Sequence, residues 1–522
     1  LPQLQPQRAA LLPVVRRALS RRAVLRGALL LVAGALTACD DAARPPPALA
    51  MGLAQAPTTL DPRHAIDAAS ARICRLLYRP LVAGDERGVA VPVLADWERV
   101  APDRYLFSLR PDAPAFADGS AVTARDVAAT YASVLDPATA SPHRGALAAV
   151  ARVEALDDAR VAFQLSRPDP LFPAYATIGI LPAAALAADR DFDAAPLGNG
   201  PFVLAGREGD GRLRLRRRSD GLAIDFVEVK DPTVRALKLL RGEIQLVQND
   251  LPPELARYLG EQAGIRLDSR PGTSFAYLGL NLEDPALADA RVREAIALAL
   301  DRDAIVAALF RGLAEPGESI LPPDHWAGAE LPAPPHDPAR ARTLLGEAGF
   351  GPARPLRVGY KTSADPFRLR LATVIQHQLA RAGIETTIRS YDWGTFFGDV
   401  KAGRFQLYSL AWVGVSTPDI FRYAFHSASL PPAGANRGRF RSTTVDALIE
   451  QAERAGDAAE LARLFRAVQA ELHAARAFIP LWREHNVAAV RAEVDGYHLA
   501  RDGNYDGIAT VVVRPIPADR HP

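Results

Sequence analysis

The stretch LRVGYKTSADPFRLRLATVIQHQLARAGIETTIRSYDWGTFFGDVKAGRFQLYSLAW, residues 356–412, determines the fold class of this chain. Its apolar residues recur first with the period of a strand and then with the period of a helix, which predicts strands that alternate with helices. The predicted strands are 356–360, 384–390 and 405–412, and the predicted helices are 366–382 and 392–402. This order is typical of a parallel αβ unit, whose ligands lie beyond the carboxyl ends of the strands. Trp412 and the loop after it are therefore candidates for a binding site.

Capping signals outside this stretch predict further helices. Thr123 precedes Asp126 by three residues, which is the spacing of a capping box in front of a helix. Asp289 is a predicted N-cap, and Asp337 followed by Pro338 has the pattern of another helix start. These signals predict a helix from Thr123 to about Leu135, a helix after Asp289 and a helix over 339–347.

The composition is that of a soluble globular protein. The chain has 522 residues, which suggests about two to four domains, and it is 49% hydrophobic and 23% charged. Its two cysteines, Cys39 and Cys74, exclude a disulfide scaffold and a four-cysteine metal site. We expect no metal and no cofactor, and we expect Cys74 to be a buried thiol.

The first 38 residues have the pattern of a signal peptide. Six arginines and no acidic residue precede or flank the uncharged run GALLLVAGALTA at 27–38. As a helix this run covers about 18 Å, which is too short for the roughly 30 Å core of a bilayer. It ends in Leu36-Thr37-Ala38-Cys39, which resembles the lipobox of bacterial lipoproteins, so Cys39 would be lipidated after cleavage. The alternative is a chance cysteine behind a general export signal.

The residues around this signal bear on export and location. SRRAVLR at 20–26 resembles the twin-arginine motif, but general secretory signals also tolerate paired arginines, so both export routes stay open. Residues 39–48, with three consecutive prolines, predict a stiff tether. We expect a periplasmic or otherwise extracytoplasmic protein that is attached to the membrane by a lipid.

Charge and motifs argue against several classes of function. The six arginines of the signal exceed the net charge of +2 of the whole chain, so the remainder is net negative and gives no support to nucleic-acid binding. The sequence has no G-x-x-x-x-G-K, G-x-S-x-G, H-E-x-x-H or C-x-x-C motif. We therefore predict no catalytic residues and no enzyme activity.

Several segments in order resemble the extracytoplasmic solute-binding proteins of family 5, which serve peptide and nickel ABC importers. The most recognisable segment is LADWERVAPDRYLFSLRPDAPAFADGSAVTARDVAATYASVLDP at 94–137. It is followed by PLGNGPFVL (196–204), VRALKLLRGEIQLV (234–247) and RVREAIALALDRDAIVAALFRGLAEP (291–316). The resemblance runs from about residue 57 to residue 500, which is nearly all of the chain behind the signal.

This resemblance implies a two-lobed α/β fold of the periplasmic-binding-protein type (type II, cluster C) with an extra inserted subdomain. The two lobes would close over a ligand, and we expect a monomer. The predicted segments are 49–80, 190–270 and 486–515 for the discontinuous lobe I, 81–189 for the inserted subdomain, and 271–485 for lobe II.

The resemblance also points to the loop after Trp412 as part of the ligand site. In peptide-binding members of the family, an aspartate a few residues after a tryptophan pairs with the peptide ammonium. In AWVGVSTPDIF at 411–421 the matching residue is Val415, which argues against binding through a free α-amino group. Asp419 is the alternative partner, although Thr417-Pro418-Asp419 also fits a helix start with Thr417 as cap and Asp419 in the first turn.

Other candidates come from the second half of the chain. Arg437, next to Asn436, could hold a ligand carboxylate in a bidentate pair, or this segment is a solvated loop. Trp393 could stack on a ligand or pack in the core, and Tyr277 lies where lobe II begins, near the cleft or the hinge. The predicted ligand-binding residues are Trp412, Asp419, Phe421, Asn436, Arg437, Trp393 and Tyr277.

Three functions are compatible with these observations. The first is a lipid-anchored receptor that captures a short peptide or similar polar solute and delivers it to an ABC permease, whose ATPase subunits are separate chains. The second is a receptor of the same fold for a metal chelate, opine, sugar or haem, which Val415 favours. The third is an extracytoplasmic hydrolase, which would need a nucleophile and a base that the sequence does not offer.

Overall fold

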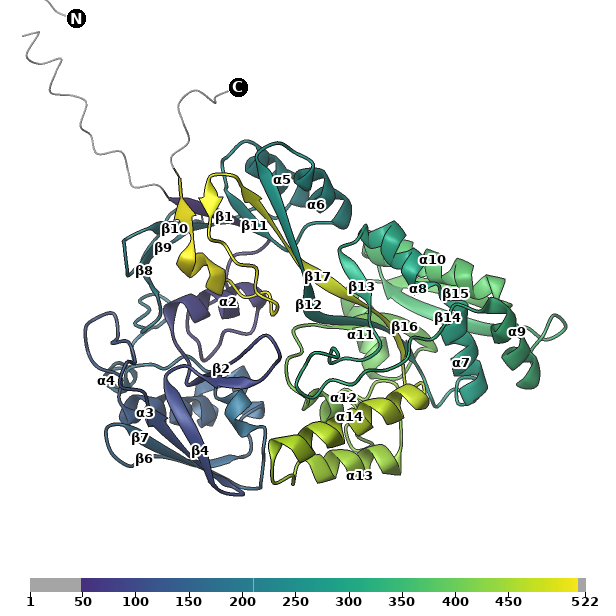
Figure 1. Ribbon diagram of the computed structural model, residues 1–522, viewed down its shortest axis with the longest axis horizontal. Helices are drawn as coiled ribbons and strands as arrows, with labels where there is room; N and C mark the ends of the chain where they lie inside the picture. The colour runs from purple at the N-terminus through teal and green to yellow at the C-terminus, as the bar shows by residue number, and fades with distance from the viewer. Residues whose placement is uncertain (1–47, 210, 515–522) are drawn as a thin grey trace, which may run out of the picture. The chain divides into compact units, whose positions relative to one another are not determined.

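The structure describes residues 48–209 and 211–514, and the central element of this part is one large mixed sheet. In this computed structural model the sheet has eleven strands in the order β15-β14-β16-β12-β17-β11-β1-β10-β9-β8, and β13 pairs with β17 beside this path (Figure 1). Its strands are β1 (Leu49–Leu53), β8 (Phe202–Arg207), β9 (Leu213–Arg217), β10 (Ala223–Glu228), β11 (Leu246–Gln248), β12 (Ile265–Leu280), β13 (Ala314–Pro316), β14 (Leu356–Ser363), β15 (Ile384–Tyr391), β16 (Leu407–Trp412) and β17 (Ile479–Arg491). The predicted signal, Cys39 and the tether up to residue 47 lie outside the described residues.

The predicted parallel αβ unit is confirmed. β14 lies between β15 and β16 and pairs in parallel with both. The connections are α10 (Pro366–Arg381) and α11 (Trp393–Lys401), whose first backbone N–H groups are capped by the side chains of Asp365 and Asp392. β16 ends at Trp412, so the loop after it lies beyond the carboxyl end of a strand, as the sequence pattern predicted.

Two long strands, β12 and β17, carry the sheet from one lobe to the other (Figure 1). They pair antiparallel over almost their whole lengths, with a register shift between Pro271 and Phe275 on β12. On one side of this shift β17 also pairs with β11, and on the other side β12 pairs with β16. The strand pair is therefore common to both lobes, and its irregular point lies between them.

Lobe I has a hydrophobic core to which distant segments contribute. Strands near residues 50, 215 and 225 share this core with α2 and with residues 488–511. Cys74 on α2 is a free, buried thiol, as predicted. The further elements of lobe I are α2 (Ala68–Leu77), α5 (Pro232–Leu240), α6 (Pro253–Gly260), β18 (Val494–Asp495), η5 (Asp506–Thr510) and β19 (Val512–Val513).

The inserted subdomain has an antiparallel sheet and a core of its own. The strand order is β4-β5-β7-β6, and the rings of Phe107, Phe163 and Phe172 pack against one another beside it. The predicted capping box is confirmed, since the carboxylate of Asp126 accepts from the N–H of Thr123 at 2.7 Å at the start of α3. Its elements are β2 (Val82–Gly84), β3 (Ala90–Pro92), β4 (Ala95–Ala101), β5 (Arg104–Leu109), α3 (Ala124–Leu135), η1 (Pro137–Thr139), η2 (Pro142–Gly145), β6 (Val150–Ala155), β7 (Arg160–Leu165), η3 (Phe172–Tyr175) and α4 (Ala183–Ala187).

Lobe II packs helices against both faces of its part of the sheet, around two hydrophobic clusters. Asp289 and Asp337 cap helices as predicted, and Gly349 follows the second of these helices with a φ of 85°. The helices are α7 (Ala290–Ala299), α8 (Arg302–Ile305), η4 (Val306–Phe310), α9 (Pro338–Glu347), α12 (Ile420–Phe425), α13 (Thr443–Ala452) and α14 (Ala458–Ala474). No helix in the described part of the chain is long and apolar enough to cross a bilayer. The residue boundaries of the lobes stay predictions.

A buried arginine reinforces the strand pair next to its register shift. Arg483 on β17 is 2% exposed and donates to the carbonyl oxygens of Ile320, at 2.8 Å, and Ser319. Its guanidinium carbon lies 5.1 Å from the ring centre of Phe275, the first residue of β12 after the shift. Burial lowers the pKa of Arg483 to about 10, so the group is still charged at neutral pH.

Replacement of this side chain tests its role. Arg483→Ala is expected to lower the free energy of unfolding by about 3 kcal/mol, because it leaves buried carbonyl groups without a donor and opens a cavity. Urea denaturation measures the change. The matched control is Arg463→Ala, which removes an exposed arginine on α14 and should change stability by less than about 0.5 kcal/mol. Equal losses in the two variants would contradict the structural role of Arg483.

Candidate functional site

Within the described part of the chain, three cavities lie along the loop of residues 413–419 that follows β16. The insert cavity, of about 590 Å³, lies between the inserted subdomain and lobe II. The central cavity, of about 520 Å³, has walls from residues 83–90, 414–417 and 500–506. The strand cavity, of about 870 Å³, lies at the register shift of β12, where Thr273 and Ser274 form part of its wall.

The three cavities adjoin one another, since neighbours share wall residues. The insert and central cavities share Ala174, Thr177, Ser416 and Thr417. The central and strand cavities share Thr273, Gly414, Asp502 and Asn504. One short loop thus borders three neighbouring cavities between the inserted subdomain, lobe I and lobe II.

A hydrogen bond from lobe II and a close backbone approach from the inserted subdomain position this loop. Nδ1 of His325 accepts from the N–H of Ala327 at 3.1 Å, so Nε2 carries the ring proton and donates to the carbonyl of Ser416 at 3.1 Å. Burial lowers the pKa of His325, which favours this neutral ring. Gly88 of the inserted subdomain has a φ of 74°, and a Cβ there would lie 2.1 Å from Nε2 of His325, so the close approach requires glycine.

Polar contacts also connect the parts of the molecule across the cavities. Arg501 of lobe I pairs with Asp324 of lobe II, with Nη2 and Oδ1 2.9 Å apart. Arg270 on β12 pairs with Glu86 of the inserted subdomain. In both pairs the carboxylate is largely exposed, so water and salt screen them and each contributes at most about 1 kcal/mol. These two ion pairs stabilise the present arrangement of the lobes and the inserted subdomain only weakly.

Four of the predicted site residues form one aromatic cluster at the end of β16. The ring of Trp412 stacks on Tyr277 with centres 5.9 Å apart and planes 11° apart. The guanidinium carbon of Arg437 lies 4.7 Å from the centre of Trp412, and Nη1 donates to the hydroxyl of Tyr277 at 3.2 Å. Arg437 also lies over Phe397, on which Trp393 stacks at 5.3 Å. Trp393 is 58% exposed, so it is not a core residue.

The structure places Asn436 and Phe421 in the interior. Asn436 is 1% exposed, and its amide bonds to the backbone of His426 and Phe440, which fixes the shape of the loop. Phe421 is also 1% exposed and packs against Phe425 and Phe465. Both side chains therefore contribute to packing within lobe II, and a ligand would have to displace these contacts to reach them.

Asp419 lies at the start of α12, in the N-cap position and not in the first turn. The helix α12 begins at Ile420, Asp419 precedes it without capping it through its side chain, and the hydroxyl of Thr417 donates to the Asp419 carboxylate. The expectation that Thr417 caps the helix with Asp419 in its first turn is therefore wrong. The carboxylate of Asp419 borders the insert cavity instead.

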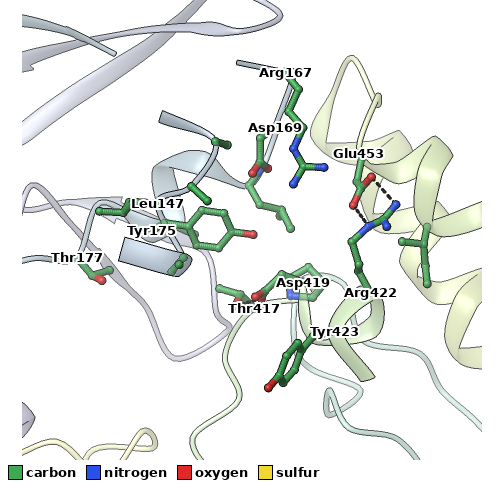
Figure 2. A pocket seen from close by; sticks show the side chains of 18 of the residues that line it. Leu147, Arg167, Asp169, Tyr175, Thr177, Thr417, Asp419, Arg422, Tyr423 and Glu453 are labelled. Carbon is green, nitrogen blue, oxygen red and sulfur yellow. Dashed lines mark hydrogen bonds and ion pairs between the residues drawn. The ribbon is translucent and has the colours of Figure 1, made fainter. Parts of the chain in front are cut away.

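A second carboxylate borders the same cavity from the inserted subdomain (Figure 2). Asp169 follows β7 and accepts from the N–H of Leu171 at 3.0 Å. Burial raises the pKa of Asp169 to about 6, and the charges of Glu453 and Asp419 act in the same direction. Burial also raises the pKa of Asp419, although the hydrogen bond from Thr417 opposes this shift. Both carboxylates therefore lack a partner that fully compensates their loss of water.

Other polar groups complete the wall of the insert cavity. Figure 2 shows the hydroxyl of Tyr175 between the carboxylates of Asp169 and Asp419 in that view. Burial, together with the negative charges of Asp419 and Asp169, raises the pKa of Tyr175, so its hydroxyl is a neutral donor. Arg422 and Glu453 form a two-bonded ion pair beside them, with Nη2 and Oε2 2.8 Å apart.

Sequence reasoning missed Asp169 and Tyr175. The sequence pattern that could have revealed Asp169 is the run Arg167-Pro168-Asp169-Pro170, which follows a strand. The two prolines of this run restrict the backbone around the aspartate. β7 belongs to an antiparallel sheet, however, so the rule on carboxyl ends of parallel strands did not apply to it. Among the described residues, no group of three or more His, Cys, Asp or Glu side chains could hold a metal ion.

Comparisons with known proteins identify relatives of this chain. A family model described as bacterial extracellular solute-binding proteins, family 5, middle region, matches residues 89–429. "Probable di/tripeptide-binding protein 5" of Pseudomonas aeruginosa (strain UCBPP-PA14) is 30% identical over 82% of this chain and 88% of its own length. An ABC transporter substrate-binding protein of Listeria monocytogenes has a similar structure, with a TM-score of 0.81 and 22% identity over 90% of this chain and 100% of its own. A periplasmic binding protein of Helicobacter pylori in complex with the peptide STSA gives 0.70 and 23% over 90% and 98%.

The raised pKa of Asp169 predicts a pH-dependent stability. A carboxyl with a higher pKa in the folded than in the unfolded protein costs stability when both forms are ionised, and this cost is relieved as the pH falls. Asp169→Asn removes the charge and should raise the free energy of unfolding at pH 7 by about 1 to 3 kcal/mol. The gain should shrink as the pH falls through about 6 and vanish near pH 4.

Urea unfolding at four values between pH 4 and pH 7 measures this difference. The control is Asp158→Asn, which neutralises an exposed aspartate of the same subdomain that is paired at the surface with Arg125. A constant difference between Asp169→Asn and the unaltered protein over this range would show that the carboxyl does not titrate as stated.

Proposed function

The chain belongs to the bacterial extracellular solute-binding proteins of family 5, and we propose that it captures a short peptide or a similar small polar solute for an ABC importer. The solved relatives have the same two-lobed α/β fold, so the predicted fold class, type II and cluster C with an inserted subdomain, is confirmed. The family consists of binding proteins of transporters, which confirms that the chain is not an enzyme and removes the hydrolase hypothesis.

The observation that carries the proposal is the position of loop 413–419 on three adjoining cavities between the parts of the molecule. A solute in the central cavity would contact this loop, the inserted subdomain and lobe I at the same time. It would therefore stabilise the arrangement in which these parts are close, by its higher affinity for that state. The closed complex would then be the form that delivers the solute to a membrane permease with separate ATPase subunits.

The proposed contacts of the solute come from two groups of side chains. Tyr423 is half-exposed, borders the insert cavity and contacts the edge of Trp412, so it connects that cavity with the aromatic cluster. Trp412 and Trp393 would stack on the solute, and Arg437 would pair with a carboxylate. Asp419 would accept from a donor group of the solute.

A non-peptide solute is the second candidate, for a specific reason. Val415 borders the central cavity at the position where the family pattern has an aspartate, and it packs against the apolar cluster of lobe II. An uncharged side chain there gives no ion pair to a free α-amino group. A metal chelate, an opine, a sugar or haem would not need one.

Peptide binding is tested with a library of di- and tripeptides in free and N-acetylated form. A peptide that binds the folded state should raise its stability by about 2.7 kcal/mol at a concentration of 100 times Kd, which thermal unfolding and native mass spectrometry detect. Affinity that survives N-acetylation would agree with Val415. If none of the peptides stabilises the protein, the peptide proposal fails and the non-peptide solute takes its place.

A substitution in the aromatic cluster tests whether the solute binds there. Trp412→Leu should weaken binding of the same solute by roughly tenfold, because it removes the stacking surface shared with Arg437 and Tyr277. Trp97→Leu, on β4 of the inserted subdomain, is the matched control and should leave affinity unchanged. Equal affinity in both variants would place the solute away from Trp412.

We also propose that Cys39 bears a lipid that keeps the protein at the outer side of the membrane. The support is the lipobox pattern in the sequence. Cys39→Ala should move the protein from the membrane pellet to the soluble fraction, whereas Cys74→Ala, which replaces the buried thiol, should not. Retention of Cys39→Ala in the pellet would rule out anchoring through this residue.

A further inference from the structure

The insert cavity has an unbalanced negative charge. Its wall has the carboxylates of Asp169, Asp419 and Glu453 and the guanidinium groups of Arg167 and Arg422. Arg422 is occupied by its bidentate pair with Glu453. This leaves two carboxylates against one exposed arginine, so the cavity is one positive charge short of neutrality.

The remaining titratable groups of the wall do not supply this charge. Burial lowers the pKa of His143, so its ring is neutral at pH 7. Tyr175 is neutral as well, since its pKa is raised. Arg167 lowers the pKa of Asp169, but the effects of burial and of the other carboxylates prevail. An ammonium or guanidinium group has the positive charge and the N–H donors that complement two carboxylates.

The cavity is open to a solute that occupies the neighbouring space. Ala174, Thr177, Ser416 and Thr417 border both the insert cavity and the central cavity. Thr417 and Asp419 both border the insert cavity, so a side chain or an end group of a solute in the central cavity is one loop residue away from the wall that contains Asp419. The volume of about 590 Å³ is ample for an amino-alkyl or guanidino-alkyl chain.

We propose that the insert cavity binds an alkylammonium or guanidinium group of the transported solute between the carboxylates of Asp169 and Asp419, with the hydroxyl of Tyr175 beside it. This inference rests on the proposed function and narrows it to solutes with a cationic group. Because Asp169 belongs to the inserted subdomain and Asp419 to lobe II, the cation joins these two parts and replaces their mutual repulsion by two charge-assisted hydrogen bonds.

The test compares tripeptides that contain either lysine or norleucine at the same position, for each of the three positions. Norleucine keeps the apolar chain of lysine and lacks its ammonium. For at least one position the lysine peptide should bind about tenfold more tightly by calorimetry, which corresponds to about 1.4 kcal/mol. Ratios near one at all three positions overturn the inference, while the binding itself leaves the proposed function standing.

Two variants test whether these carboxylates cause the preference for the lysine peptide over the norleucine peptide. Asp169→Asn and Asp419→Asn should each bring the lysine-to-norleucine ratio to within about twofold of one, because each removes one of the two carboxylates that bind the cation. Asp158→Asn, outside the cavity on the same subdomain, should keep the full ratio. Unfolding curves check that the variants are folded, and Asp169→Asn is expected to be the more stable form at pH 7. A ratio that persists in either cavity variant overturns the shared site.

A separate arm applies if no tripeptide binds and the proposed function fails. Butylammonium chloride then serves as the probe, against sodium chloride at the same ionic strength. Stabilisation of the unaltered protein and of Asp158→Asn, but not of the two cavity variants, supports the cation site. Equal melting temperatures in both salts for the unaltered protein overturn it.

Discussion

The antiparallel pairing of β12 with β17 is the constraint on which the remaining structure depends. These two strands belong to the sheets of both lobes, and their register shifts between Pro271 and Phe275, where the lobes meet. A regular ladder would make the two halves of the sheet one stiff plane. The shift leaves residues 272–274 outside the ladder at the wall of the strand cavity, so the same irregularity interrupts the ladder and forms part of the site.

The loop after β16 combines two environments that favour different chemistry. At its start, Trp412 contributes to a cluster of stacked rings around one guanidinium group. At its end, Asp419 borders a cavity in which carboxylates prevail. Between them, Val415 and Ser416 offer an uncharged wall, with Ser416 held by His325. A solute that spans this loop would meet an aromatic, then a neutral and then an anionic surface, which favours an extended molecule with unlike ends.

The sequence predicted the features that depend on neighbours along the chain. The parallel unit at 356–412, the capping box of Thr123 and Asp126, and the caps at Asp289 and Asp337 are local patterns, and each is confirmed. The family resemblance pointed to the loop after Trp412, which borders the cavities. Local patterns did not predict the interior positions of Asn436 and Phe421, because burial depends on which segments meet in the fold. Asp169 stayed unnoticed since its partner Asp419 lies 250 residues further along the chain.

The topology of the two shared strands has a consequence for lobe II as a module. In the described structure the chain enters this lobe along β12 and leaves it along β17, and these strands are direct neighbours. The segment between Leu280 and Ile479 therefore begins and ends at neighbouring positions of two paired strands. Such an insertion can be exchanged or enlarged without disturbing the order of strands in lobe I. Substitutions within this segment can therefore change its part of the cavity walls while the strand order of lobe I stays the same.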